Sequence, residues 1–240
     1  MRFVCKKCIL GLILFSLYCS TTDSESNYTK FSFIKSTKKP ITTFKSKKRI
    51  AIQTFIDERE KDNISYFGLL LIPLVPYAKE DFNKPELAEQ FGIIFLPETD
   101  LANAMVTELT DYSVFEKVFY TDRTFPKDAD YLIRVRIKKN QIYNKETMYG
   151  INTLAGQYFS VLWILLSTDF YRIKLDVELE LLDLKTNQIT FKKNFEKEES
   201  DSEWGAKKKK FIGEEFFSIN KMMIRTMSKE IIQQFGGNEK

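Results

Sequence analysis

Two serine–lysine pairs are the first residues whose spacing suggests chemistry. Ser36 and Ser218 each precede a lysine by three positions, Lys39 and Lys221, the spacing at which a lysine can activate a serine nucleophile. The Ser-Asp-Asn and Lys-Thr-Gly triplets that accompany such a pair in penicillin-binding enzymes are missing. The chain also has no histidine, the commonest general base and zinc ligand. We therefore expect no enzyme, and a histidine-independent hydrolase stays only the weakest alternative.

The sequence also gives little sign of a cofactor site, a metal site or a nucleic-acid binding surface. The nine glycines form neither a phosphate-binding loop nor a dinucleotide fingerprint, and the three cysteines all lie within the first 19 residues. The charge of +4 includes three basic residues of the N-terminal leader, which has no acid, so the remainder carries 34 basic and 33 acidic side chains. We expect no cofactor, no metal site and no nucleic-acid partner.

Cys19 is the residue with the clearest chemical prospect. A basic stretch, Met1–Lys7, and an apolar run, Cys8–Tyr18, form a secretory signal that is shorter than the roughly 20 residues needed to span a bilayer. Cys19 and the polar residues after it resemble the cleavage box of bacterial lipoproteins, although Ser16 and Tyr18 depart from the usual residues before the cysteine. The resemblance implies that Cys19 carries acyl chains, such as palmitate, that bind the membrane.

These features predict a signal peptide at 1–18, a lipidated cysteine and flexible tether at 19–47, and a single domain at 48–237. An alternative for the tether is that Phe31, Phe33, Ile34 and Phe44 dock parts of it onto the domain. We expect an outer-membrane location, lipid-anchored, on the periplasmic side or the cell surface.

The domain shows an alternation of strand and helix patterns. Strands are predicted at 49–55, 115–120, 130–143, 171–184 and, after a turn at 185–188, through 195, and helices at 99–112 and 214–235. The order predicts an α+β fold with a mixed, mostly antiparallel sheet of four to five strands and two helices on one face. If strands 130–143 and 171–184 are neighbours, Arg134, Arg136 and Lys138 face Asp176, Glu178 and Glu180 as a ladder of opposite charges, and this face of the sheet is wet or meets a polar partner.

Two excursions interrupt this pattern, at 67–77 and at 148–170, and the apolar segment of the second is 158–166. Prolines at 73 and 76 argue against a central strand in the first. Three interpretations stay open: a satellite core, an exposed patch for a partner or self-assembly, or a membrane-inserting element. The residues that would make partner or membrane contact are Leu70, Leu74, Tyr77, Phe159, Leu162 and Trp163.

Short motifs within 49–195 resemble a family of uncharacterised, spirochaete-type lipoproteins of Gram-negative bacteria. The motifs are Pro-Leu-Val-Pro-Tyr at 73–77, Tyr149-Gly150, Leu162-Trp163 and a strand ending in Asp-Leu-Lys-Thr at 183–186. Asn187-Gln188 departs from that family, in which a glycine is common at this turn. More distantly, the order of elements is similar to the curli secretion lipoprotein CsgG, the cell-wall synthase activator LpoB and the N-terminal domain of TolB. That similarity implies secretion channels or envelope adaptors.

Two functions compete. The first is a lipid-anchored, non-enzymatic adaptor or assembly factor that binds an envelope protein. The alternative is an oligomeric secretion or pore subunit similar to CsgG, for which the chain would form a homo-oligomer with the excursions in the membrane.

Replacing Cys19 by alanine tests the anchor. We expect Cys19→Ala to be exported but released from the membrane, because no other residue of the leader region carries the acylation signal. Fractionation and labelling with a radioactive fatty acid measure both effects. Retention of the variant in the membrane with undiminished label would contradict the lipoprotein prediction.

Overall fold

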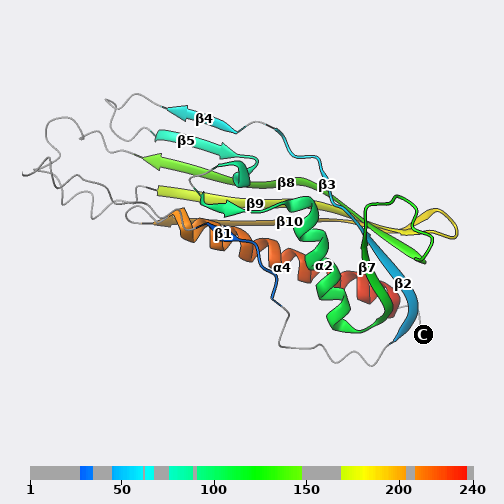
Figure 1. Ribbon diagram of the computed structural model, residues 1–240. Helices are drawn as coiled ribbons and strands as arrows, with labels where there is room; N and C mark the ends of the chain where they lie inside the picture. Colours follow the sequence, from blue (N-terminus) through cyan, green and yellow to red (C-terminus); the bar gives the residue numbers. More distant parts are fainter. Residues whose placement is uncertain are drawn as a thin grey trace, which may run out of the picture.

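The computed structural model describes residues 28–34, 45–61, 63–67, 76–88, 91–147, 169–203 and 209–236. Within these ranges two long helices, a short 3₁₀ helix and ten strands follow one another (Figure 1). In chain order they are β1 (Thr29–Lys30), β2 (Ser46–Gln53), β3 (Ile56–Asp57), β4 (Ile64–Phe67), β5 (Pro76–Phe82), η1 (Pro85–Leu87), β6 (Ile93–Ile94), α2 (Pro97–Tyr112), β7 (Phe115–Thr121), β8 (Tyr131–Thr147), β9 (Asp169–Asp183), β10 (Gln188–Glu203) and α4 (Lys209–Gly236).

β8 is the strand around which the sheet is arranged. One of its edges pairs antiparallel with β9, which pairs antiparallel with β10. The other edge pairs successively with β2, β3 and β5, while β7 lies beyond β2 and β4 beyond β5. Within the described residues these strands form one eight-stranded sheet, so the expectation of four to five strands is wrong.

The expectation of a mostly antiparallel sheet is also wrong, because the sheet is mixed. β2 runs parallel to β7 and β8, and β3 runs parallel to β8. Parallel neighbours need a crossover connection, and α2 provides it between β2 and β7. Alternating patterns in the sequence predict the strands but carry no information about their direction.

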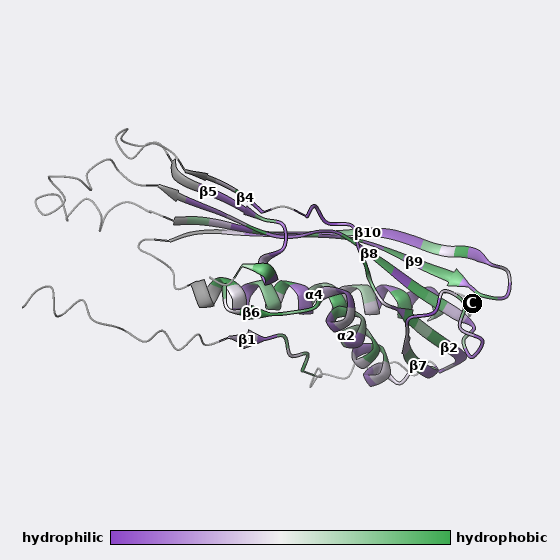
Figure 2. Ribbon diagram, turned by 45° about the horizontal axis from the view of Figure 1, so that its top comes forward, coloured by the Kyte–Doolittle hydropathy of each residue, from purple (hydrophilic) through white to green (hydrophobic). Residues whose placement is uncertain are grey.

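Both helices cover the same face of the sheet, as expected, and contact each other (Figure 1). The apolar stripe of α2 and that of α4 are buried against the inward side chains of β2, β8 and β9. Figure 2 shows hydrophobic residues (green) alternating with hydrophilic ones along these helices and strands. Fully or almost fully buried members of this core are Ile50, Ile52, Leu101, Met105, Leu109, Ile133, Val135, Ile137, Ile173, Leu175, Val177, Leu179, Phe216, Met227 and Ile231.

α2 starts earlier than Thr99 or Asp100, the caps that the sequence suggests. Its first residue is Pro97, whose fixed φ and missing N–H suit the first helical position. Asp100 acts from inside the helix, where its carboxylate accepts a hydrogen bond of 2.8 Å from the backbone N–H of Leu96. The helix ends at Ser113, which adopts a left-handed φ of 53°.

A β-bulge at Lys138 changes which residues of β8 face the helices. The register with β9 shifts between Ile137 and Lys139. Odd-numbered residues point inward before the bulge, and after it the buried residues are Asn140, Ile142 and Asn144. Asn140 therefore lies in the core, where its amide exchanges hydrogen bonds of 3.0 and 3.3 Å with that of Asn220 on α4.

The segment after the expected lipidation site is partly packed against the domain. β1 pairs parallel with β6, and Phe31 is 8% exposed, with its ring against those of Phe95 and Phe217. Arg225 of α4 donates a hydrogen bond to the carbonyl of Ile34. Residues 28–34 thus dock onto the domain, the alternative that the sequence leaves open for part of the tether, while Phe44 lies outside the described residues.

The first apolar excursion is shorter than expected, because β4 and β5 flank it. Pro76 is the first residue of β5, a position where a strand tolerates the missing N–H of proline. Phe67 lies opposite Ala78, and Pro76 opposite Thr147, so the strands that lead into both excursions terminate at the same end of the sheet. Residues 68–75 and 148–168 lie outside the described part of the chain. Among the helices of that described part, none is long and apolar enough to cross a membrane.

The Asn140–Asn220 pair yields a stability prediction. Asn220→Ala leaves the buried amide of Asn140 without its partner, which should lower the free energy of unfolding by about 1–3 kcal/mol. The double change Asn140→Leu with Asn220→Leu removes both polar groups and should cost less than the single change. Chemical denaturation of each variant measures this, with Lys229→Ala on the exposed side of α4 as control. A double variant that is less stable than Asn220→Ala would contradict the account.

Candidate functional site: the polar face of the sheet

The face of β8, β9 and β10 that points away from the helices carries mainly charged side chains. Arg134 lies opposite Glu180, and Arg136 opposite Glu178, as the sequence predicts for neighbouring strands. Lys138 sits at the bulge and donates a hydrogen bond of 2.8 Å to Glu178. We call this helix-free side the polar face.

The acids of β9 are enclosed by bases from both neighbouring strands. Lys192 of β10 reaches Glu178 at 2.8 Å and Glu180 at 2.9 Å, from the side opposite β8. Glu178 and Glu180 are only 8% and 4% exposed. Hydrogen bonds from Lys138 and Lys192 lower the pKa of Glu178 from 4.5 to about 2. This part of the polar face is internally compensated, so it fixes the register of the three strands and presents little net charge.

Farther along the same face, two aromatic rings flank an arginine. The rings of Tyr143 and Phe170 meet edge to face, with centroids 6.3 Å apart. The guanidinium of Arg172 lies 5.8 Å from the Tyr143 centroid and 5.7 Å from that of Phe170. Arg172 also forms an ion pair of 3.4 Å with Glu198 of β10. We call Tyr143, Phe170 and Arg172 the aromatic platform.

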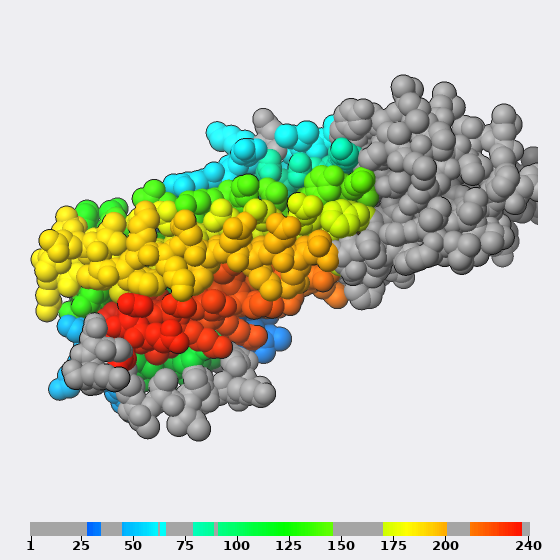
Figure 3. Space-filling view, turned by 180° about the vertical axis from the view of Figure 1, so that it is seen from behind, coloured from blue at the N-terminus to red at the C-terminus, as the bar shows by residue number. Residues whose placement is uncertain are grey.

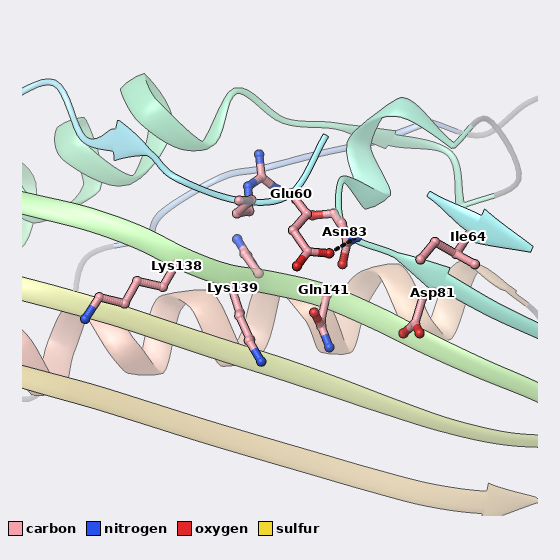
Figure 4. Close-up of a pocket in the computed structure, with 9 residues that line it drawn as sticks. Glu60, Ile64, Asp81, Asn83, Lys138, Lys139 and Gln141 are labelled. Atoms are coloured by element: carbon pink, nitrogen blue, oxygen red, sulfur yellow. Dashed lines mark hydrogen bonds between the residues drawn. The ribbon is translucent and has the colours of Figure 1, made fainter. Parts of the chain in front are cut away.

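The aromatic platform lines an open groove of about 590 Å³. The groove continues into a smaller hollow of about 150 Å³, with which it shares Asp81 and Gln141. Figure 4 shows Asp81, Gln141 and Lys139 pointing to the same side in the smaller hollow. β3 pairs with β8 up to Ile137, and β5 pairs with it from Ile142 onward. The hollow lies beside the stretch of β8 between them, residues 138–141, which pairs with neither strand. Burial raises the pKa of Asp81, because it outweighs the positive charge of Arg172, which lowers this pKa.

Behind the hollow, a buried arginine ties the end of β3 to η1. The Arg59 guanidinium lies 2.8 Å from Asp57 and 2.6 Å from Glu86, and it donates to the carbonyl of Asn83. Burial alone would raise the pKa of Asp57, but the bonds from Arg59 and Lys84 outweigh it and hold this pKa at about 2. Because these charges are paired, the cluster acts as a structural joint. Within the described ranges no group of acids is arranged to hold a metal ion.

The contact residues predicted from the sequence cannot be compared with this surface. Cys19, Leu70, Leu74, Phe159, Leu162 and Trp163 lie outside the described residues, and Tyr77 is described only through its backbone in β5. The aromatic platform escapes sequence reasoning. Phe170, expected at the end of the second excursion, is the second residue of β9. Beyond the bulge, a strictly alternating strand would place Tyr143 on the buried side.

Comparisons with known proteins give no family for this chain. No family model matches it, and no curated protein is similar to it in sequence. One similar solved structure is a Xanthomonas campestris protein of the uncharacterised family DUF330, with 9% identity, a TM-score of 0.49, and 87% of this chain and 98% of that chain covered. Another is a PelC dodecamer variant from Paraburkholderia phytofirmans, with 8% identity, a TM-score of 0.36, and 76% and 86% covered.

A third is a protein from Caulobacter crescentus proposed to be a lipoprotein, with 10% identity, a TM-score of 0.32, and 58% of this chain and 86% of that chain covered. The similarity to CsgG, LpoB and TolB that the order of elements suggests stays a prediction.

The lowered pKa of Glu178 predicts a specific acid response. Because the folded-state pKa, about 2, lies below the ordinary value of 4.5, the stabilisation is complete above pH 4.5 and is lost as the pH falls towards 2. The melting temperature of Glu178→Gln should therefore decline less steeply between pH 5 and 2 than that of the unaltered protein, because this pH range spans the two pKa values of Glu178. Glu214→Gln, at an exposed position of α4, should decline like the unaltered protein. A Glu178→Gln curve parallel to that of the unaltered protein would contradict this account.

Proposed function

We propose that the protein is a non-enzymatic binding module, held at the envelope membrane through acylated Cys19, that binds a protein partner on its polar face. The observation that carries this proposal is the aromatic platform of Tyr143, Phe170 and Arg172, which is half-buried to exposed in an open groove. No helix of the described chain covers this face (Figure 1).

The composition of the platform supports a protein partner. Tyrosine and arginine are enriched among the residues that dominate the energy of protein–protein interfaces, and aromatic rings left in water gain most from being covered. Lys145, Lys174 and Asp81 line the same groove, so charges of both signs surround the platform. A polar protein surface with both charge signs suits these surroundings better than a uniform polyanion.

The tether supports a short reach from the membrane. Residues 28–34 are packed against the domain, so only eight residues, 20–27, separate Cys19 from the docked segment. A fully extended segment of this length spans at most about 30 Å. The domain would work close to the bilayer, at the outer membrane and on either of its sides, where a partner in the same membrane is within reach.

Site-directed photo-cross-linking tests the proposal in the native membrane. A photo-reactive amino acid at Lys145, which lines the groove, should capture one discrete protein. The same probe at Lys229, exposed on α4 on the opposite face, should not. Tyr143→Ala or Arg172→Ala should reduce capture from position 145 about tenfold or more, as expected for the loss of a dominant contact.

Thermal melting checks that these surface changes leave the fold intact. Equal capture from positions 145 and 229, or capture that survives both alanine changes, would rule out the aromatic platform as the binding surface.

A further inference from the structure

β10 forms an edge of the sheet. It pairs with β9 along its whole length, and no other strand of the described chain pairs with its second edge. Figure 3 shows β10 (yellow) along the surface of the molecule with α4 (red) directly below it. A free edge of 16 residues presents a row of main-chain N–H and C=O groups that can pair with another strand.

A groove lies between this edge and α4. It has a volume of about 250 Å³ and is lined by Phe195 and its neighbours on β10 and by Met222, Met223 and Thr226 on α4. Met222 is 42% exposed, a large apolar side chain beside an unpaired edge. Methionine adapts its shape readily to a partner surface. The edge and the groove together offer main-chain pairing and apolar contact at one place.

The charges along β10 are separated by sign. Its first half carries Lys192 and Lys193, and its second half carries Glu196, Glu198 and Glu199 with one base, Lys197. Charged side chains on an edge strand can prevent its pairing with another chain, but that role does not require bases and acids to be separated along the strand. Two such strands attract each other when they run antiparallel, because the basic half of one then faces the acidic half of the other.

We propose that a second copy of this chain is the partner of the β10 edge, in a twofold-symmetric dimer whose two β10 strands pair antiparallel about Asn194. A twofold axis perpendicular to the sheet keeps each residue on the same face of the sheet in both copies. Directly opposite residues must share a face, so the axis must lie midway between the two copies of one residue. With the axis at Asn194, Lys192 faces the partner's Glu196, Lys193 faces the partner's Phe195, and no like charges are opposed between 188 and 200.

Neighbouring registers are worse. An axis at Phe195 opposes Lys193 and Lys197, and an axis at Lys193 or Glu196 sets a charged residue against itself. Charges directly opposite each other in a sheet are destabilising when they have the same sign. The charge order therefore favours the register centred on Asn194, and Asn194 also lines the groove.

The helices also fit this arrangement. α4 contacts both β9 and β10, so it lies over the space between them. With strands about 4.8 Å apart, the two α4 axes would lie roughly 10 Å apart on the same face of the joined sheet. Packed helices are separated by about 8–10 Å, so exposed Met222 of each copy would be covered without a clash. This dimer leaves the aromatic platform open and is independent of the proposed function.

Disulfide cross-linking through one added cysteine tests the register. The full-length protein is extracted in mild detergent, and each variant is compared with the unaltered chain. Asn194→Cys should form a disulfide-linked dimer under mild oxidation, because the two cysteines face each other across the axis. Ser200→Cys on the same face should not, because the axis separates its two copies by about 40 Å. Cross-linking at both positions, or at neither, would overturn the proposal.

Charge reversal supplies a second, independent measurement. Glu196→Lys turns two attractive pairs into repulsive ones and should raise the dimer dissociation constant about tenfold in native mass measurements. Glu198→Lys loses ion pairs within the chain in the same way but lies opposite Thr190, so it should leave the constant within about threefold. A monomeric unaltered protein, a complex of one copy with a different protein at this edge, or equal effects of both reversals would overturn the proposal.

Discussion

The pairing of β8 with β9 constrains the rest of the structure, and the bulge at Lys138 is the feature that makes this pairing possible along the full length of both strands. Ile137 and Ile142 are both buried, yet they are five residues apart, a spacing that an uninterrupted strand cannot place on one face. One extra residue in β8 restores the match with β9. The bulge thereby directs Asn140 into the core and Tyr143 onto the polar face, and it leaves the hollow between β3 and β5 beside it.

Elements with strong periodicity could be predicted from the sequence. The strands at β8 and β9, the buried stripe of α4 and the pairs of Arg134 with Glu180 and Arg136 with Glu178 follow from alternation and charge order alone. The third expected pair, Lys138 with Asp176, is wrong, because the bulge sets Lys139 opposite Asp176 and Lys138 bonds Glu178 instead. The β9–β10 turn is also explained: Asn187 adopts a left-handed φ of 54°. Asparagine tolerates this left-handed conformation better than most residues.

The features that sequence reasoning missed depend on contacts between distant segments. The direction of β7 is set by the crossover through α2, and β3, β4 and β5 are short strands that their own sequences hardly mark. The aromatic platform joins Tyr143 to Phe170 across the second excursion, so no local pattern could reveal it. The odd spacing of Ile137 and Ile142 is the one signal that could have predicted the bulge. The pore alternative, which rests on residues 68–75 and 148–168, stays a prediction.

The central claim is that the bulge at Lys138 determines which residues of β8 form the polar face. Cysteine scanning from 139 to 145 tests it most directly, by measuring how fast a charged thiol reagent modifies each folded variant relative to the unaltered chain. We expect fast modification at 139, 141, 143 and 145, on the polar face, and strong protection at 140, 142 and 144, which are buried. Protection at the odd positions with fast modification at the even ones would show an uninterrupted strand and would contradict this claim.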